Sequence, residues 1–234
     1  MKNNSYIGIA FIILVFGVIF IPKIVDRIKD GDISRSESRS GTISSQDSIK
    51  KGQENASNLF SFSKVPAFEF LNQDGKPISN SFYSGKVYVV EFFFTTCPTI
   101  CPKMNENMLK IQHEFDANSD FGIASFSINP THDTPQILKE YAISHGATLK
   151  NWNFLTGDQS KIYELSNKGF TLFAGENSNA EGGFEHSGMF ALIDKQGTIR
   201  SRFDEFGNPI IFYDGLEAKG IKMIIEDIAI LLKE

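Results

Sequence analysis

Cysteine is scarce in this chain, and its scarcity limits the chemistry open to the protein. Only two cysteines occur among 234 residues, Cys97 and Cys101. Two cysteines four positions apart close no long loop, so a disulfide framework of the kind that holds small secreted domains together is excluded. The pair is therefore expected to form a local site, either for a metal ion or for thiol–disulfide chemistry.

Clustered positive charge is also missing. The formal net charge is -5, and no block of Lys and Arg occurs. Proteins bind nucleic acid largely by neutralising phosphates with clustered cations, so we expect no nucleic-acid partner. A hydrophobic content of 41% and a charged content of 22% are ordinary for a globular protein. The length suits one folded domain better than two.

A single long apolar run stands near the N-terminus, at residues 7–21. As a helix it would cover roughly 22 Å, and the flanking Tyr6, Ile24 and Val25 extend it toward the thickness of a bilayer core, about 30 Å. A cleaved signal peptide is the alternative, but the small residues of a cleavage site do not follow the run. We therefore predict an uncleaved N-terminal transmembrane helix, with residues 1–29 as the membrane anchor.

The polar stretch after this run is predicted to be a flexible tether over residues 30–64. It is dominated by Ser, Asp, Glu, Arg and Gly and shows no apolar period, so it cannot form a core. The alternative is an arm packed on the domain near residues 59–62. Lys23, Arg27 and Lys29 follow the apolar run, which by the positive-inside rule argues against export of the domain. We nevertheless expect a single-pass cell-membrane protein with its domain on the extracytoplasmic side, because of the site described next.

Residues 65–234 are predicted to form one domain of the α/β class. Apolar runs at residues 87–94 and 121–128 indicate buried strands, with helices at 103–115 and 134–145. Further elements are expected as strands at 68–71 and 152–155, a helix at 160–167, a long loop at 174–185, a hairpin of 189–194 with 198–203, and a final helix at 218–232. Strands that alternate with helices favour a layered sheet covered by helices.

The two cysteines lie in the segment TTCPTICP at residues 95–102, where a buried strand gives way to a helix. Backbone N–H groups at a helix N-terminus stabilise a thiolate, which is both a nucleophile and a metal ligand. A spacing of four places both sulfurs on one helical face, so they can bind one ion or form a disulfide. Soft thiolates select Cu(I) or Zn and need a third ligand. Two buried cysteines that act only as small apolar side chains are the remaining alternative.

Histidine could supply that third ligand, and only four histidines occur. His113 and His145 lie on predicted helices and are expected to be surface or packing residues, whereas His132 lies in a turn after the second strand and could face the site. His186 ends the long polar loop, at the junction that faces the cysteine loop in a thioredoxin-like fold. No proline occurs between positions 135 and 209, so the cis-proline of thioredoxin-type reductases is missing there. Two sulfurs and one imidazole form a Cys₂His set suited to Cu(I), and to Cu(II) with a further oxygen ligand.

Two acidic residues are candidate supporting groups. Glu91 interrupts the apolar strand before the cysteines. If buried, its pKa would rise and it could accept a proton from the thiols, but it could equally lie at the rim or pair with a lysine. Asp133 could bond a ligating imidazole or cap the helix that begins near residue 135.

At this point the motifs match a known family. The chain resembles the Sco/SenC copper chaperones of cytochrome c oxidase assembly over about residues 65–234. The resemblance lies in FTTCPTICP at 94–102, in SINPTHDTP at 127–135, and in EHS at 185–187 followed by LID. It implies a thioredoxin-like fold with a central mixed sheet flanked by helices, and copper held by Cys97, Cys101 and His186. Thr99 and Asn129 stand where the family often has acidic residues.

What the resemblance implies for function is a metallochaperone rather than an enzyme. It would deliver copper to the dinuclear copper site of cytochrome c oxidase subunit II or to another copper-receiving protein, or keep the thiols of that site reduced. The alternative from the residues themselves is a membrane-anchored thiol–disulfide oxidoreductase that uses Cys97 and Cys101 without metal. A third alternative is a sensor or scaffold in which the metal only orders the domain.

Overall fold

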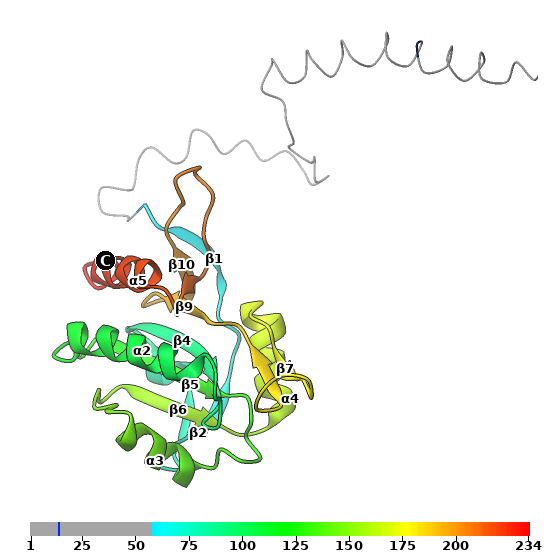
Figure 1. Cartoon of the computed structure of the whole chain (residues 1–234). Helices are drawn as coiled ribbons and strands as arrows, with labels where there is room; N and C mark the ends of the chain where they lie inside the picture. The colour runs from blue at the N-terminus through cyan, green and yellow to red at the C-terminus, as the bar shows by residue number, and fades with distance from the viewer. Residues whose placement is uncertain (1–13, 15–57) are drawn as a thin grey trace, which may run out of the picture. The chain divides into compact units, whose positions relative to one another are not determined.

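The computed structural model describes Leu14 and residues 58–234 (Figure 1). The predicted anchor, apart from Leu14, and the predicted tether up to residue 57 lie outside the described residues. Within the described part of the chain, no helix has both the length and the apolar character needed to cross a bilayer. The transmembrane helix therefore stays a prediction.

A mixed sheet forms the centre of the domain, with the order β1-β10-β9-β4-β5-β6-β2-β3 and with β11 paired to β9 (Figure 1). Its strands are β1 (Phe60–Lys64), β2 (Glu69–Asn72), β3 (Pro77–Ser79), β4 (Val87–Phe93), β5 (Phe121–Ser127), β6 (Trp152–Thr156), β9 (Met189–Ile193), β10 (Thr198–Ser201) and β11 (Tyr213–Asp214). Strands β4, β5 and β6 run parallel to one another, and their other pairings are antiparallel. The carboxyl ends of β4 and β5 therefore meet at one edge, where ligand sites commonly form in such sheets.

Helices cover both faces of this sheet, which explains why β4 and β5 are buried along their whole length. Successive side chains of a strand point to opposite faces. Phe92 stacks on Phe126 at 5.4 Å between ring centroids and meets Phe170 at 5.7 Å. On the opposite face, Phe93 contacts Tyr141 at 5.4 Å. A mixed sheet with helices on both faces confirms the predicted α/β fold class.

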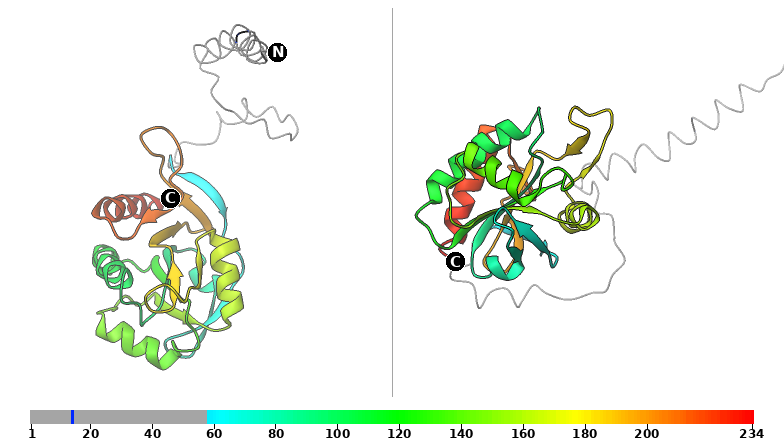
Figure 2. Two further views of the ribbon diagram at one scale, coloured as in Figure 1. Left: turned by 45° about the vertical axis from the view of Figure 1, so that its right-hand side comes forward. Right: turned by 90° about the horizontal axis from the view of Figure 1, so that it is seen from below.

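The helical elements are η1 (Asn80–Tyr83), α2 (Cys101–Phe115), α3 (Pro135–Ser144), α4 (Gln159–Glu164), the π-helical turn η2 (Leu165–Phe170) and α5 (Ala218–Leu231). Helix α2 begins two residues before the predicted start at Lys103, so that Cys101 belongs to its first turn. Helices α2 and α5 pack against each other (Figure 2). Proline opens α3, and the Thr134 side chain accepts the N–H of Ile137 as its cap.

The folded part of the chain begins earlier than the predicted boundary at residue 65. Residues 60–64, which the sequence placed in the tether, form β1 and pair with β10, with Phe60 opposite Ser201 and Lys64 opposite Thr198. The ring of Phe60 also meets that of Phe203 edge-on at 5.9 Å. A sheet edge offers unpaired N–H and C=O groups, and β1 satisfies those of β10 although its own sequence is half polar.

The predicted loop at residues 174–185 is also more ordered than expected. It contains two short antiparallel strands, β7 (Ala174–Glu176) and β8 (Phe184–His186), which form a separate two-stranded sheet. Gly182 and Gly183 lie at φ of 88° and 81°, a conformation that glycine adopts without steric strain. The chain can therefore reverse at these glycines and return as β8, which ends at His186.

Candidate metal centre

The loop between β4 and α2 holds the two cysteines at the carboxyl edge of the sheet. The N–H of Cys97 donates to the carbonyl of Phe94 at 3.2 Å, which folds the loop into a turn. Cys101 is the first residue of α2, and the N–H of Met104 bonds the carbonyl of Ile100 at 3.0 Å. Both sulfurs therefore lie at the end of α2 where unpaired N–H groups and the helix dipole favour negative charge.

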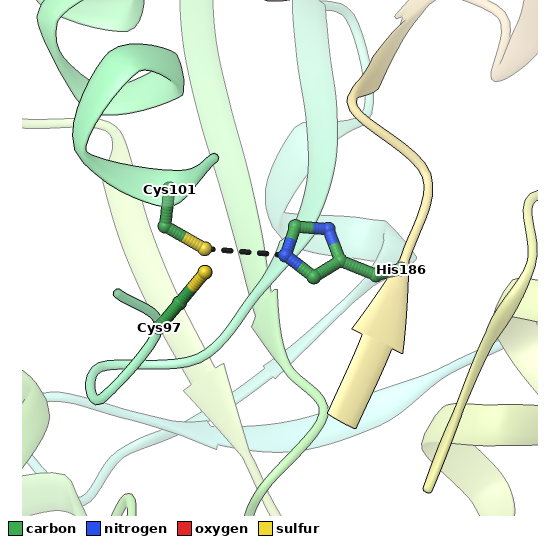
Figure 3. A group of neighbouring side chains, drawn as sticks. All are labelled: Cys97, Cys101 and His186. Carbon is green, nitrogen blue, oxygen red and sulfur yellow. Dashed lines mark hydrogen bonds between the residues drawn. The ribbon is translucent and has the colours of Figure 1, made fainter. Parts of the chain in front are cut away.

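The third donor comes from β8, far along the chain. Sγ of Cys101 lies 3.2 Å from Nε2 of His186, although the two residues are 85 positions apart. The donor atoms of Cys97, Cys101 and His186 all lie within 4.8 Å of one another. Figure 3 shows both sulfurs and the imidazole edge pointing toward a common centre. All three residues are buried, with exposed fractions of 8%, 2% and 8%.

The hairpin β7–β8 fixes the orientation of the imidazole. His186 pairs with Ala174 across the hairpin, and its Nδ1 lies 3.1 Å from the carbonyl of Ser187. A carbonyl only accepts, so Nδ1 carries the proton and Nε2 presents its lone pair to the sulfurs. The ring of Phe94 meets the imidazole edge-on at 5.9 Å. A Cβ at Gly182 would lie 3.0 Å from that phenyl ring, so glycine lets the hairpin pack closely over the cysteine loop.

The two thiols differ in protonation. The hydrogen bond from Cys101 lowers the pKa of Cys97 from 9.0 to about 3, and this outweighs the opposing effect of burial. The same hydrogen bond raises the pKa of Cys101 above its usual value, and burial acts in the same direction. At neutral pH, Cys97 is therefore a thiolate and Cys101 a thiol.

Glu91 lies fully buried in β4, without a cation to pair with among residues 58–234. Its Oε1 accepts the hydroxyl of Ser125 at 2.7 Å, and that hydroxyl oxygen in turn accepts Nε1–H of Trp152 at 2.9 Å. Oε2 has no hydrogen-bond partner in the described part of the chain. Burial raises the pKa of Glu91 to about 7, although Ser125 and the nearby His186 oppose the shift. Of the alternatives offered by the sequence, the structure therefore shows a buried carboxyl group. Its role in accepting protons from the thiols stays a prediction.

Asp133 contacts the imidazole of His132 and not that of His186, and it does not cap α3. His186 bonds the Ser187 carbonyl instead, and Thr134 caps α3. Asp133 is fully buried, and its two oxygens accept hydrogen bonds from Thr95 at 2.5 and 3.0 Å. This carboxylate therefore fixes the start of the cysteine loop rather than the imidazole of His186.

The other histidines lie outside the donor cluster. His113 and His145 are exposed, as predicted, and His145 stacks on Tyr141 with 4.0 Å between ring centroids. His132 is half exposed, and its Nδ1 lies 2.8 Å from Oδ1 of Asp133. His132 therefore neighbours the cysteine loop without forming part of the cluster.

The two positions that depart from the family pattern both lie near the cysteine loop. Oγ1 of Thr99 is 3.7 Å from Sγ of Cys97. Asn129 is buried, and its Oδ1 accepts the hydroxyl of Thr131 at 3.0 Å. Neither side chain can carry negative charge, so the field at the sulfurs is less negative than acidic residues would make it.

Sequence reasoning missed three residues that position the site. Ser125 stands directly opposite Glu91 in the parallel pairing of β4 with β5, so aligning the two apolar runs would have found it. The sequence pattern around Thr95 and Ser187 indicates their roles less clearly than the alignment does for Ser125. Thr95 acts through Asp133, which is 38 positions away, and Ser187 acts through its backbone carbonyl.

The donor set and its spacing fit one soft metal ion. Metal–sulfur and metal–nitrogen bonds of roughly 2.0–2.3 Å place three donors of one ion about 3.5–4 Å apart. The cluster spans no more than 4.8 Å, so an ion would need only small side-chain movements. Two thiolates with one imidazole suit Cu(I), and the same sulfurs could form a disulfide.

The model of the SCO1/SenC family matches residues 57–219, which include both cysteines and His186. The chain belongs to the SCO1/SenC family. The SCO1 protein homolog of Bacillus subtilis (strain 168) is 36% identical over 147 residues, which cover 62% of this chain and 76% of that protein. The matched family segment begins three residues before β1, in agreement with the place where the folded part starts.

Solved structures of SCO1/SenC proteins share the fold. A SCO1/SenC family lipoprotein from Bacillus anthracis is 33% identical, with a TM-score of 0.63, over 72% of this chain and 95% of that one. BsSco is described, with a disulfide switch, as a member of the Sco family of cytochrome c oxidase assembly proteins. It is 32% identical, with a TM-score of 0.61, over 73% of this chain and 94% of that one. Copper-bound ScoI of Bradyrhizobium japonicum is 20% identical, with a TM-score of 0.57, over 73% of this chain and 100% of that one. At this identity the similarity is one of fold.

Proposed function

We propose that this SCO1/SenC protein is a copper metallochaperone. It binds one copper ion through Cys97, Cys101 and His186 and delivers it to the dinuclear copper site of cytochrome c oxidase subunit II. The observation that carries the proposal is the convergence of three copper-type donors, from segments 85 positions apart, within 4.8 Å. Relatives of known structure, among them a Sco protein of cytochrome c oxidase assembly and a copper-bound ScoI, support the same conclusion.

The cluster is built for an ion that enters and leaves by ligand exchange. The Cys97 thiolate already carries the charge that attracts a cation, and Cys101 loses its proton as its sulfur joins the ion. Three donors leave a coordination position open to a donor of a partner protein. A partner thiolate can therefore bind the ion before the last bond to this chain breaks, and the ion is never released to water.

A membrane location belongs to the same proposal. The apolar run at residues 7–21 anchors the chain in the cell membrane, and the domain lies on the extracytoplasmic side. The support is the apolar run in the sequence and the metal site of the domain. Protease treatment of intact cells tests it: the domain should be cleaved without lysis, and protection until lysis would place it in the cytoplasm.

The test of copper ligation compares three versions of the purified full chain: wild type, His186→Ala and His113→Ala. Removing one of three ligands should weaken Cu(II) binding at least about 100-fold, because outer-shell changes alone weaken metal sites 10–100-fold. His113 is exposed and outside the cluster, so its variant should bind as the wild type does. Equal Cu(II) affinity in wild type and His186→Ala would remove the imidazole from the site and with it the proposal.

Thiol–disulfide exchange is the second candidate, favoured by the unequal thiols. The Cys97 thiolate would attack a partner disulfide, forming a mixed disulfide and releasing one partner thiolate. Cys101, once deprotonated, would attack Sγ of Cys97, so that this chain ends as a disulfide and the partner as a dithiol. This chemistry does not use the imidazole as a ligand. The His186→Ala variant decides between the two functions. If it reduces a disulfide at the wild-type rate and also binds copper as the wild type does, thiol–disulfide exchange is favoured.

A further inference from the structure

Two loops lie side by side at the carboxyl edge of the sheet. Strands β4 and β5 are parallel, Phe93 stands opposite Ser127, and the N–H of Ile128 donates to the carbonyl of Phe93 at 2.8 Å. The loop that follows β4 carries Cys97, and the loop that follows β5 carries His132. Topology therefore places this histidine on the loop that adjoins the cysteine loop, although it is not one of the three clustered donors.

The carboxylate of Asp133 joins the two loops. Its Oδ2 accepts the N–H of Thr95 at 3.0 Å and the hydroxyl of Ser127 at 2.5 Å. Its Oδ1 accepts the hydroxyl of Thr95 at 2.5 Å and lies 2.8 Å from Nδ1 of His132. Thr95 precedes Cys97 by two positions, which keeps their Cα atoms within about 7 Å. Through Asp133, the imidazole of His132 is thus connected to Thr95, at the start of the loop that carries Cys97.

The same contact decides which nitrogen of His132 can bind a metal. A carboxylate accepts hydrogen bonds, so Nδ1 donates and Nε2 keeps its lone pair. Metal-binding histidines commonly have such a carboxylate on the other ring nitrogen. The side chain is 48% exposed, and among residues 58–234 nothing bonds Nε2. By contrast, Nδ1 of His145 lies 2.9 Å from the carbonyl of Tyr141, and that ring stacks on the tyrosine.

The three-donor cluster itself is nearly closed to solvent. Cys97, Cys101 and His186 are exposed by only 8%, 2% and 8%. A hydrated ion that reaches this cluster must lose its waters where few donors are accessible. An exposed imidazole on the adjoining loop offers a first ligand at the surface.

We infer that His132 is an auxiliary copper ligand at the entrance of the site. Its Nε2 binds the ion at the surface, and the ion then passes to Sγ of Cys97. In that step the Cu–Sγ bond forms and the Cu–Nε2 bond breaks, with no change in the oxidation state of copper. The inference rests on the proposed function, and it adds a route by which the buried donors exchange metal.

Kinetics of copper uptake provide the first test. The full chain is mixed rapidly with Cu(II), and the absorption of thiolate-to-copper charge transfer is followed. His132→Ala should bind the same amount of copper with the same final affinity but about tenfold more slowly, in keeping with the loss of one accessible donor. His113→Ala, which removes another exposed imidazole, should match the wild type. Circular dichroism of each variant checks that the fold is retained.

Electron paramagnetic resonance provides the second test, independent of rates. In His186→Ala, Cu(II) at the sulfurs should still show one nitrogen ligand, supplied by His132, and the coupling should vanish in His186→Ala/His132→Ala but not in His186→Ala/His113→Ala. Uptake by His132→Ala at the wild-type rate, together with no His132-dependent nitrogen coupling, would overturn the inference while leaving the proposed function intact. A wild-type protein without the charge-transfer band would overturn both.

Discussion

Glu91 is a carboxyl group enclosed by the sheet and the helices above it. Burial raises its pKa from 4.5 to about 7. Between these pH values the folded protein holds a proton that the unfolded chain has released. Folding stability supported by this group is therefore complete below about pH 4.5 and is lost as pH rises through 7.

Replacement by glutamine tests this titration at the residue scale. Glu91→Gln keeps an oxygen for the Ser125 hydroxyl but removes the proton. A shift from 4.5 to about 7 corresponds to about 3 kcal/mol, so wild type should lose about that much stability relative to Glu91→Gln between these pH values. Urea unfolding at several pH values measures the difference, in which effects of Cys97 titration largely cancel. Exposed Glu114→Gln is the control, and parallel pH profiles for wild type and Glu91→Gln would contradict the assignment.

At the scale of elements, one side chain holds two loops together. Asp133 accepts hydrogen bonds from Thr95, Ser127 and His132, and each of its oxygens has two partners. Such a contact between the ends of adjacent parallel strands fixes the loop that carries Cys97. Asp133 thus positions the cysteine loop although it touches none of the three clustered donors.

Exchanging one oxygen of this carboxylate for an amide tests that dependence. In Asp133→Asn, an NH₂ group must face N–H and O–H donors, and a buried hydrogen bond left unmade typically costs about 1–3 kcal/mol. Asp133→Asn should therefore lower the free energy of unfolding by roughly 2–3 kcal/mol. Urea unfolding measures it, with exposed Asp116→Asn as the matched control. A change no larger than that of the control would show that the contact between the loops contributes little.

Five strands are missing from the sequence prediction, namely β1, β3, β7, β8 and β11, and two of them show why. β1 pairs with β10, whose residues follow it by more than 130 positions, and β8 forms only because the chain reverses at Gly182 and Gly183. The segment of β8 lacks the apolar alternation by which strands are recognised, and in β1 that alternation is limited to Phe60 and Phe62 beside the polar stretch. Strands β4 and β5 were predictable because burial on both faces demands a continuous apolar run.

In the site, too, residues close in sequence were predictable, and contacts between distant residues were harder to predict. The strand–helix junction at Cys97 and Cys101 is a local pattern, and it was read from the sequence alone. The place of His186 beside them depends on the path of the chain, and it was predicted from the position of that junction in a thioredoxin-like fold and from the family resemblance. The partners of Asp133 could not be predicted, because only the folded sheet brings Thr95 to it.

At the scale of the whole molecule, β1 completes one edge of the sheet. The carbonyl of Leu59 accepts a hydrogen bond from Arg200 at 3.3 Å, and Phe60 packs on Phe203. A protein that starts at Val65 would lack β1 and expose β10 as a new edge. We expect it to melt at a lower temperature and to associate at high concentration, compared with a protein that starts at Asn58. Calorimetry and light scattering measure both, and equal melting temperatures with no association would place β1 outside the cooperative fold.

Cys101 and His186 lie 85 positions apart, yet their donor atoms are 3.2 Å apart. An ion held by both is a cross-link that closes a long loop, and a covalent link around a loop of this size restrains the unfolded chain by about 4–5 kcal/mol. In the unfolded chain only the sulfurs of Cys97 and Cys101 remain close together, so the ion is bound by fewer donors and more weakly. Under the proposed function, metal and fold would thus stabilise each other: the copper-bound protein would resist unfolding, and an unfolded one would release its metal.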